Sequence, residues 1–567
     1  MNSNHRQGRR SGMTAIAVTV IAVVVMFAGA AVPAQAQTPT VLHTFTIGST
    51  DACKPEGNIV QGRDGNMYGG GAVCGGNGSG AIYKISPAGV ESMFFSFPGT
   101  WLYCGGAGLT LGSDGNFYGA CEAGNPATGL GSIFRLTPAG VFTDLHDFTG
   151  ANGDSFPVYP PIQASDGNFY GVTGNEVQVC GNIYKMTPAG VYTNLHTFTW
   201  GNSDCHSSNL VQASDGNLYG TLADCAVVQG AGCVYKISTA GVFKEIHDFA
   251  FSTGQEPCTG LIQGKDGKLY GATNQGAANG WGNIYKMTTA GVATDLHDFN
   301  NATDAACVNN VWAPVNMLQV ADGTFYGVNP AYGPSGTGSI YKLTSANVFS
   351  AFLFPVPLVD GDLPSSTLIQ HTNGLVYGTT PSGGFIPPNC PQGCQGTFFS
   401  VATGDKPFVS LEPTEKTGNV GASVGMFGQG FSSASVVKFG GVAATKVTLS
   451  GTTYLTAVVP AGAHTGAVTV TTGTTTLTSP QTYKVKPKIT SFSPSSGPAG
   501  TLVTINGTGL IQTSAVKFGT VKATTFTVVS DSKVTAVVPS GLAAGAVTIS
   551  VTTPGGAANS PTKFTVN

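Results

Sequence analysis

Ala213-Ser214-Asp215-Gly216-Asn217-Leu218-Tyr219-Gly220 is the stretch that decides the fold, because the chain repeats its pattern seven times. The turn dipeptide is Asp-Gly in six copies and Asn373-Gly374 in the seventh, and a Tyr-Gly pair begins four residues later in every copy. The seven dipeptides begin at residues 64, 114, 166, 215, 266, 322 and 373. A period of about fifty residues is typical of propellers and other repeat arrays, in which each repeat buries its core against its neighbours.

Each repeat predicts four antiparallel strands. In the fourth copy, the apolar runs 208–212 and 218–221 lie on either side of the Asp-Gly turn. This arrangement is a strong hairpin signal, because a type I′ turn needs positive φ at both central residues. The alternating stretches 233–237 and 242–249 predict the third and fourth strands. Four antiparallel strands in each repeat make one propeller blade, and we expect Tyr of Tyr-Gly to pack between blades while Gly admits the neighbouring sheet.

The strand count predicts a seven-bladed β-propeller. Repeats one to six each supply four strands, whereas the seventh supplies only three, at residues 367–370, 375–378 and 397–400. An unmatched strand, residues 41–45, precedes the first repeat. We expect this strand to complete the last blade, because it then closes the ring without leaving an exposed edge.

The recurring motifs resemble those of the GloVer tandem repeat of exported bacterial proteins. They are Asp-Gly-Asn-Phe-Tyr-Gly at 114–119, Gly-Asn-Ile-Tyr-Lys-Met-Thr-Pro-Ala-Gly-Val at 181–191 and Leu-His-Thr-Phe at 195–198. The resemblance covers roughly residues 41–400. It implies an envelope or extracellular protein of the choice-of-anchor kind, and it assigns no activity to any residue of this chain.

The period changes after residue 405. Phe439-Gly440 returns as Phe518-Gly519, and the Val-Val-Pro motif at 458–460 returns at 537–539. Two tandem units rich in Val and Thr, with Gly and Pro turns, predict Ig-like β-sandwiches at 406–486 and 487–567. Both units resemble the IPT/TIG domain: the second through its stretches 493–501 and 505–510, and the first, more loosely, through 426–431.

Residues 1–36 have the features of a signal peptide. Arg6, Arg9 and Arg10 form a basic start, residues 13–32 are largely apolar, and Ala34-Gln35-Ala36 is an Ala-x-Ala cleavage site. We therefore expect export, with the propeller occupying residues 37–405 of an extracellular or cell-surface protein. The periplasm is the alternative compartment, and an uncleaved membrane anchor is the alternative to a mature protein without a membrane span.

Charge divides unevenly along the chain. Residues 37–405 carry 11 basic and 25 acidic residues, whereas residues 406–567 carry 11 Lys, no Arg and 3 acidic residues. With no Arg in the basic part and an export signal at the start, we expect no nucleic-acid partner. The Lys residues of the tail either contact an anionic envelope polymer or protect exposed strand edges.

The twelve Cys of an exported chain indicate disulfides, with metal ligation as the alternative. Three pairs flank the turns of their own repeats, and a fourth pair is close in sequence. The candidate pairs are Cys53–Cys74, Cys104–Cys121, Cys205–Cys225 and Cys390–Cys394.

Aromatic residues of the long loops are the candidate ligand-binding residues. They are Trp101, Trp200, Trp281 and Trp312. Aromatic faces there can recognise sugar rings, or each Trp instead plugs the seam beneath its own loop. The His that recurs in the fourth strand is expected to be scaffold. The Gln that recurs three residues before the turn either lines the central channel or satisfies neighbouring backbone groups, and we expect the latter.

No His-Glu-x-x-His motif, phosphate loop or Gly-x-Ser-x-Gly elbow occurs in a suitable context. We therefore expect no catalytic residue, no metal and no cofactor. The hypothesis is a secreted or surface-displayed binding protein, with the propeller recognising an extracellular polysaccharide or envelope polymer and the Ig-like domains as its stalk. The alternatives are a propeller enzyme acting on carbohydrate or a lactone, and a structural envelope protein without a ligand.

Overall fold

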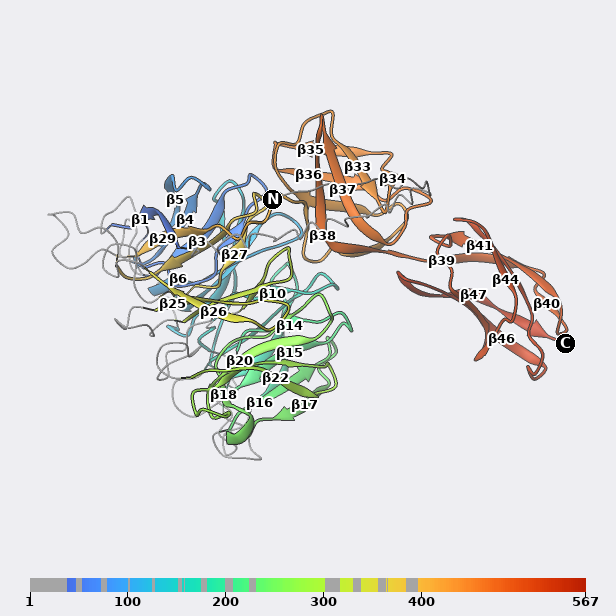
Figure 1. Ribbon diagram of the computed structural model, residues 1–567, viewed down its shortest axis with the longest axis horizontal. Helices are drawn as coiled ribbons and strands as arrows, with labels where there is room; N and C mark the ends of the chain where they lie inside the picture. The colour runs from blue at the N-terminus through green and yellow to red at the C-terminus, as the bar shows by residue number, and fades with distance from the viewer. Residues whose placement is uncertain are drawn as a thin grey trace, which may run out of the picture. The chain divides into compact units, whose positions relative to one another are not determined.

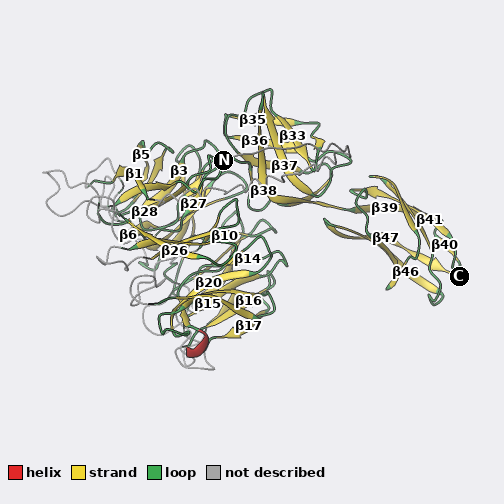
Figure 2. Cartoon of the chain, in the orientation of Figure 1, coloured by secondary structure: helices red, strands yellow, loops and turns green. Residues whose placement is uncertain are grey.

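In the computed structural model, the described part of the chain is all-β apart from one short helical turn (Figures 1 and 2). It describes residues 38–46, 52, 54–72, 79–99, 102–124, 128–150, 155–157, 159–174, 181–198, 208–223, 231–300, 317–329, 338–354, 364, 366–383 and 396–567. The predicted signal peptide, residues 1–36, lies outside the described residues. Within the described residues, none of the helical structure has the length and apolar character needed to span a bilayer.

Seven sheets follow the seven repeats, and each is one propeller blade. Blades 1 and 2 contain β2 (Val60–Gln61), β3 (Met67–Gly71), β4 (Ala81–Ile85), β5 (Glu91–Ser96), β6 (Leu102–Leu111), β7 (Phe117–Ala123), β8 (Ser132–Leu136) and β9 (Phe142–Asp147). Blades 3 and 4 contain β10 (Ile162–Gln163), β11 (Phe169–Val172), β12 (Asn182–Met186), β13 (Tyr192–Thr197), β14 (Val211–Gln212), β15 (Leu218–Leu222), β16 (Cys233–Ile237) and β17 (Phe243–Asp248). Blades 5 and 6 contain β19 (Ile262–Gln263), β20 (Leu269–Gln275), β21 (Asn283–Met287), β22 (Ala293–Asp298), β23 (Leu318–Gln319), β24 (Phe325–Asn329), β25 (Ser339–Leu343) and β26 (Phe349–Leu353).

Blade 7 joins the two ends of the propeller. Its first three strands are β27 (Ile369–Gln370), β28 (Val376–Thr380) and β29 (Thr397–Val401). The fourth is β1 (Thr40–Thr44), from the start of the described chain, which pairs antiparallel with β29. The ring of seven blades is therefore closed by backbone hydrogen bonds between segments more than 350 residues apart.

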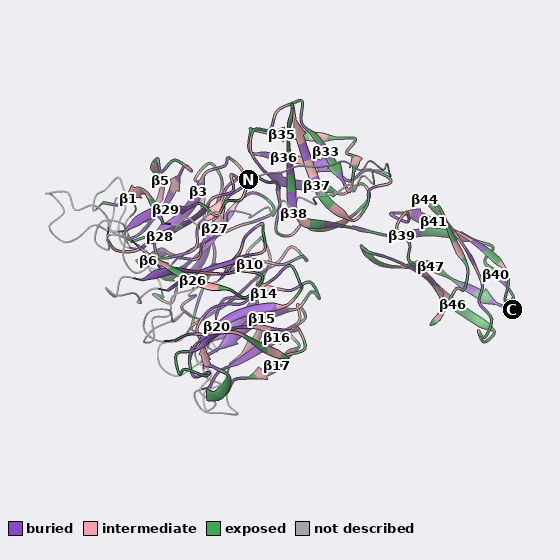
Figure 3. Ribbon diagram, viewed as in Figure 1, coloured by how far each residue is buried: buried purple, intermediate pink, exposed green. Residues whose placement is uncertain are grey.

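The propeller core lies in the seams between blades. Figure 3 shows the second strands buried, as in β15, while outer strands such as β17 are partly exposed. The aromatic ring of Tyr118 in blade 2 packs on Phe169 of blade 3 with ring centroids 4.0 Å apart. Equivalent clusters occur at every seam of the ring, so each blade depends on both of its neighbours.

The C-terminal region forms two β-sandwiches, each with its own buried core. The first contains β30 (Ser410–Leu411), β31 (Thr417–Asn419), β32 (Ser423–Phe427), β33 (Val436–Phe439), β34 (Val442–Ala443), β35 (Val447–Ser450), β36 (Tyr454–Val458), β37 (Gly466–Thr472) and β38 (Thr475–Lys486). The second contains β39 (Lys488–Ser493), β40 (Ser496–Gly497), β41 (Leu502–Thr508), β42 (Ala515–Phe518), β43 (Val521–Lys522), β44 (Phe526–Ser530), β45 (Lys533–Val537), β46 (Gly545–Thr553) and β47 (Gly556–Val566). Along these strands buried and exposed residues alternate, as expected for a sandwich with one solvated face on each sheet.

Candidate functional site

Strand topology gives the propeller two different faces. The Asp-Gly turns, between strands one and two, and the turns between strands three and four lie on one face, which we call the turn face. The loops between strands two and three and the connections between blades lie on the other, which we call the long-loop face. The turns are uniform from blade to blade, whereas the loops differ in length and sequence.

On the turn face, the Asp of each Asp-Gly turn organises its own blade. The carboxylate of Asp64 accepts hydrogen bonds from the Asn66 backbone N–H (3.1 Å), the Asn66 side chain (2.8 Å) and the Tyr68 hydroxyl (2.9 Å). The Tyr-to-Asp bond recurs in the next four blades at 2.7 to 3.0 Å. Burial works to raise the pKa of Asp64, but bonds from Lys84, Asn66 and Tyr68 outweigh it and hold the pKa below its usual range. These carboxylates are turn-stabilising groups.

The repeated Gln side chains connect each blade to the one before it. In each case the amide oxygen accepts a hydrogen bond from a backbone N–H in the preceding blade's turn. The pairs are Gln61 with Thr372 (3.1 Å), Gln163 with Ser113 (2.8 Å), Gln212 with Ser165 (2.7 Å), Gln263 with Ser214 (2.8 Å), Gln319 with Lys265 (2.8 Å) and Gln370 with Ala321 (2.8 Å). The prediction that Gln satisfies neighbouring backbone groups is therefore confirmed.

This series of Gln hydrogen bonds around the ring has one gap. Blades 1 and 2 lack the bond, because Leu111 stands at the Gln position of blade 2. Arg63 fills the gap: its Nη2 donates to the Ser113 carbonyl at 2.7 Å. The same guanidinium binds the Glu412 carboxylate of the first sandwich, with Nη2–Oε1 at 2.6 Å, and lies 4.5 Å from the centroid of the Tyr454 ring. The Glu412 side chain is 3% exposed and that of Arg63 is 27% exposed, so the carboxylate of this ion pair is buried.

Further contacts fix the first sandwich to blades 7 and 1 of the turn face. The Phe408 backbone N–H donates to the Thr372 carbonyl at 3.1 Å, and the Gln429 amide donates to the Thr372 hydroxyl at 2.8 Å. The Thr453 hydroxyl donates to the Arg63 carbonyl at 2.9 Å. Blades 7 and 1 are the two that β1 joins, so the first sandwich spans the seam at which the ring closes.

One expectation for the repeat is wrong. Tyr of Tyr-Gly does pack between blades, but Gly makes room within its own sheet. A Cβ at Gly171 would lie 2.3 Å from the hydroxyl of Tyr184, its cross-strand partner on β12, and Gly220 stands in the same relation to Tyr235. The cause is the aromatic ring of the third strand, which lies across the second strand.

The repeated His side chains are scaffold. His196 stacks on Phe243 of the next blade at 3.9 Å between centroids, and His297 stacks on Phe349 at 3.9 Å. Burial lowers the pKa of His196, which favours the neutral ring in this stack. These rings therefore pack the outer strand of one blade against the next blade.

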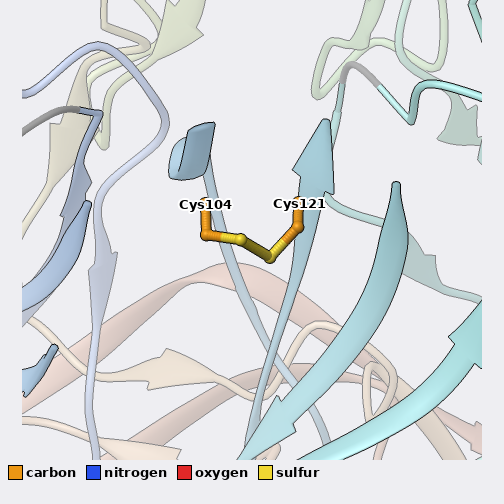
Figure 4. Close-up of a disulfide and its surroundings, with 2 residues drawn as sticks. All are labelled: Cys104 and Cys121. Carbon is orange, nitrogen blue, oxygen red and sulfur yellow. A yellow bond between two sulfur atoms is a disulfide. The ribbon is translucent and has the colours of Figure 1, made fainter. Parts of the chain in front are cut away.

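Several predicted site residues of the long-loop face lie outside the described residues. They are Trp101, Trp200, Trp312, Cys53, Cys74, Cys205, Cys225, Cys390 and Cys394. Cys104 and Cys121 are described and form a disulfide (Figure 4). Both lie in paired strands of blade 2 and not in loops, because β6 extends over ten residues and sets Cys104 opposite Cys121.

A possible metal group among the described residues is Cys233 with Glu245 and Asp248, whose ligand atoms lie within 4.8 Å of one another. Cys233 is disulfide-bonded, as is Cys258, so its sulfur is not available as a thiolate ligand. The two remaining carboxylates fall short of the six to eight oxygens that a calcium ion takes.

Of the predicted ligand-binding Trp residues, the structure describes Trp281. This residue lies in one of two loops of blade 5 that are hydrogen-bonded to each other. One loop, residues 250–258, contains the helical turn Phe251–Thr253 (red in Figure 2) and β18 (Gln255–Pro257). The other, residues 274–282, comprises the end of β20 and its connection to β21. β18 pairs with β20 and so adds a fifth strand to this blade, whereas each other blade has four strands among its described residues. We call residues 250–258 and 274–282 the blade 5 loop pair.

The blade 5 loop pair holds both aromatic side chains that are exposed among the described residues. Phe251 is 61% exposed and Trp281 is 39% exposed. The other large apolar side chains exposed in the described propeller are Val residues of the turn face. Sequence reasoning missed Phe251; the available signal was an aromatic residue in a connection between blades, at a position that no other repeat shares.

These features define a β-propeller protein with two C-terminal Ig-like sandwich domains. Comparison with family models gives the particular kind: residues 30–222 and 157–311 match the Gloeobacter/Verrucomicrobia repeat, and residues 487–566 match the IPT/TIG domain. The chain therefore carries Gloeobacter/Verrucomicrobia repeats followed by an IPT/TIG domain. No curated protein matches it.

Solved structures similar to the chain are distant. A streptogramin B lyase is 16% identical, with 63% of this chain and 96% of the other covered and a TM-score of 0.43. A fungal alcohol oxidase in complex with copper is 12% identical, with 94% and 100% covered and a TM-score of 0.40. A surface glycan-binding protein from Prevotella bryantii is 18% identical, with 29% and 40% covered and a TM-score of 0.21.

Proposed function

We propose that this protein is an exported binding protein that recognises an extracellular ligand, a polysaccharide or another envelope polymer, with the long-loop face of its propeller. The observation that carries the proposal is the contrast between the faces. On the turn face, the repeated Asp, Gln and Tyr are engaged in hydrogen bonds, and the first sandwich contacts blades 7 and 1. On the long-loop face, the loops differ between blades, and the blade 5 loop pair carries two exposed aromatic residues.

The arrangement also supports the stalk role of the C-terminal domains. The first sandwich is attached on the side opposite the long loops, so it does not compete with a ligand bound there. The Cys104–Cys121 disulfide ties together the two strands that lead to the long loops of blade 2, and a restrained surface loses less conformational entropy on binding. Export is supported by the basic start, apolar run and Ala-x-Ala site of residues 1–36.

The test uses the full chain without its first 36 residues, applied to a carbohydrate microarray and to immobilised cell-wall and exopolysaccharide fractions. We expect saturable binding to at least one of these polymers. Release of a shortened or ring-opened product would instead favour the propeller enzyme. An absence of binding to every polymer would favour the structural envelope protein and refute the proposal.

A further inference from the structure

We infer that the blade 5 loop pair is a subsite for an uncharged carbohydrate; this inference rests on the proposed function and adds the place and class of the ligand. Its first support is that the two loops are fixed to each other before any ligand arrives. The Ala277 N–H donates to the Phe251 carbonyl at 2.7 Å, and the Asn283 side chain donates to the Thr253 carbonyl at 3.1 Å. A Cβ at Gly276 would lie 2.3 Å from the Phe251 carbonyl oxygen, so the backbones meet closely.

The same contacts bring the two exposed aromatic residues to one place. Phe251 is bonded through its backbone to Ala277, and Trp281 forms a backbone bridge with the adjacent Gly276. Both residues therefore stand beside residues 276 and 277. An aromatic face offers a sugar ring a flat apolar surface against its C–H groups, and large exposed aromatic residues of this kind often dominate binding energy.

Amide side chains are concentrated in the same loop pair and at residue 300, which bonds to it. They are Gln255, Asn274, Gln275, Asn279 and Asn300, and within the group the Asn279 amide donates to Asn300 at 3.1 Å and the Gln255 amide donates to Gln275 at 3.4 Å. An amide carries both donors and an acceptor, which matches the hydroxyl groups of a sugar. A loop pair that carries both exposed aromatic residues and several amides is therefore suited to a polyhydroxyl ligand.

The charge of the loop pair favours an uncharged carbohydrate over an anionic one. Glu256 is the single charged residue in the loop pair, and its carboxylate already accepts bonds from Asn274 (2.9 Å) and Gln275 (3.0 and 3.1 Å). No Lys or Arg lies within the loop pair to bind a uronate, sulfate or phosphate group. An anionic polymer would instead meet the Glu256 carboxylate and the acidic propeller.

The test measures dissociation constants of the full mature chain for neutral polysaccharides (β-glucan, xylan, mannan) and anionic ones (alginate, polygalacturonate). We expect binding to a neutral polymer, weakened about tenfold or more by Trp281→Ala and by Phe251→Ala, since aromatic anchors carry most of such affinities. Val242→Ala and Val292→Ala are matched controls, because these side chains are 71% and 65% exposed on the turn face. Melting temperatures of all four variants exclude a loss of fold.

Three results would overturn the inference. They are preference for the anionic polymers, unchanged affinity in both aromatic variants, and equal weakening in the Val controls. The first two leave the proposed function intact, because the long-loop face could bind through another blade or take another class of polymer. Failure to bind any polymer would overturn both proposals.

Discussion

Replacing Arg63 with Met should destabilise the propeller and the first sandwich together. Arg63 holds three partners at once: the Ser113 carbonyl of blade 2, the Glu412 carboxylate of the first sandwich and the face of the Tyr454 ring. Met keeps most of the apolar stem but removes the charge and all donors. The change therefore leaves the Glu412 carboxylate without its cation.

The expected loss follows from burial. Removing one partner of a buried ion pair costs about 3 to 5 kcal/mol, because the other charge stays buried and unpaired. The Arg63 side chain is 27% exposed and that of Glu412 is 3% exposed, which places the loss near the lower end, at about 3 kcal/mol. Burial raises the pKa of Glu412 and Arg63 opposes this, so the pKa should rise further in the variant. A raised pKa lowers stability as pH increases, so the loss should be larger at pH 8 than at pH 5.

Differential scanning calorimetry of the full chain measures the effect. The transitions of the propeller and the first sandwich should move down by roughly 3 to 4 °C, while that of the second sandwich stays in place. Arg63→Met with Glu412→Gln should recover much of the loss. Lys185→Met is the control, because its partner Asp166 is 33% exposed, where Glu412 is 3% exposed, and a carboxylate open to solvent loses about 1 kcal/mol or less with its cation. If Arg63→Met lowers the melting temperatures no more than Lys185→Met, the ion pair does not couple the two domains.

Three further perturbations test individual parts of the structure. Gly171→Ala should cost about 1 to 3 kcal/mol by forcing Cβ into Tyr184, whereas Gly106→Ala, whose Cβ would meet Ala72 at an ordinary 3.4 Å, should be near neutral in urea unfolding. Replacing Cys104 and Cys121 with Ala opens a loop with a sequence separation of 17 and should cost about 3 kcal/mol; an unchanged melting temperature would contradict a stabilising bridge. Burial, together with the hydrogen bond and charge of Asp147, raises the pKa of Asp144 to about 7. The stability that this carboxyl group adds is therefore present below its ordinary pKa and is lost as the pH rises toward 7. Asp144→Asn should therefore flatten the fall in melting temperature between pH 4 and pH 8, and a wild-type pH profile would refute the assignment.

The repeat pattern was sufficient to predict the blades because their contacts are local in sequence. Asp215, Gly216 and Tyr219 lie within five residues, and their hydrogen bonds close within one hairpin. The number of blades follows from counting such hairpins. The two sandwiches are also predictable, since their alternation and turn residues recur along the chain.

The contact between Arg63 and Glu412 could not be predicted in the same way. These residues are 349 positions apart, and nothing local to either one indicates the other. The gap at Leu111 was a usable signal. The second repeat is the one that lacks Gln at this position, so another donor or acceptor is needed there. The role of Gly171 was misjudged because it depends on which cross-strand residue stands opposite, and register is not visible in the motif.

The blade 5 loop pair was only partly predictable. Trp281 was singled out from its place in a long loop, but Phe251 and the surrounding amides come together through tertiary contacts. The bond from Ala277 to the Phe251 carbonyl joins residues of two loops separated by an Asp-Gly hairpin. A loop sequence that occurs in one blade cannot be compared with the other repeats. It therefore shows which residue types are present but not which residues they contact.

The measurement that tests the central claim most directly compares the two faces of the propeller. Ala278→Cys on the blade 5 loop pair and Val242→Cys on the turn face, both exposed positions, are each biotinylated and loaded with streptavidin. Binding to the best polymer from the microarray is then measured. We predict that streptavidin at position 278 abolishes binding, while streptavidin at position 242 changes the dissociation constant by about twofold or less. Binding that persists with position 278 blocked and disappears with position 242 blocked would contradict the assignment of recognition to the long-loop face.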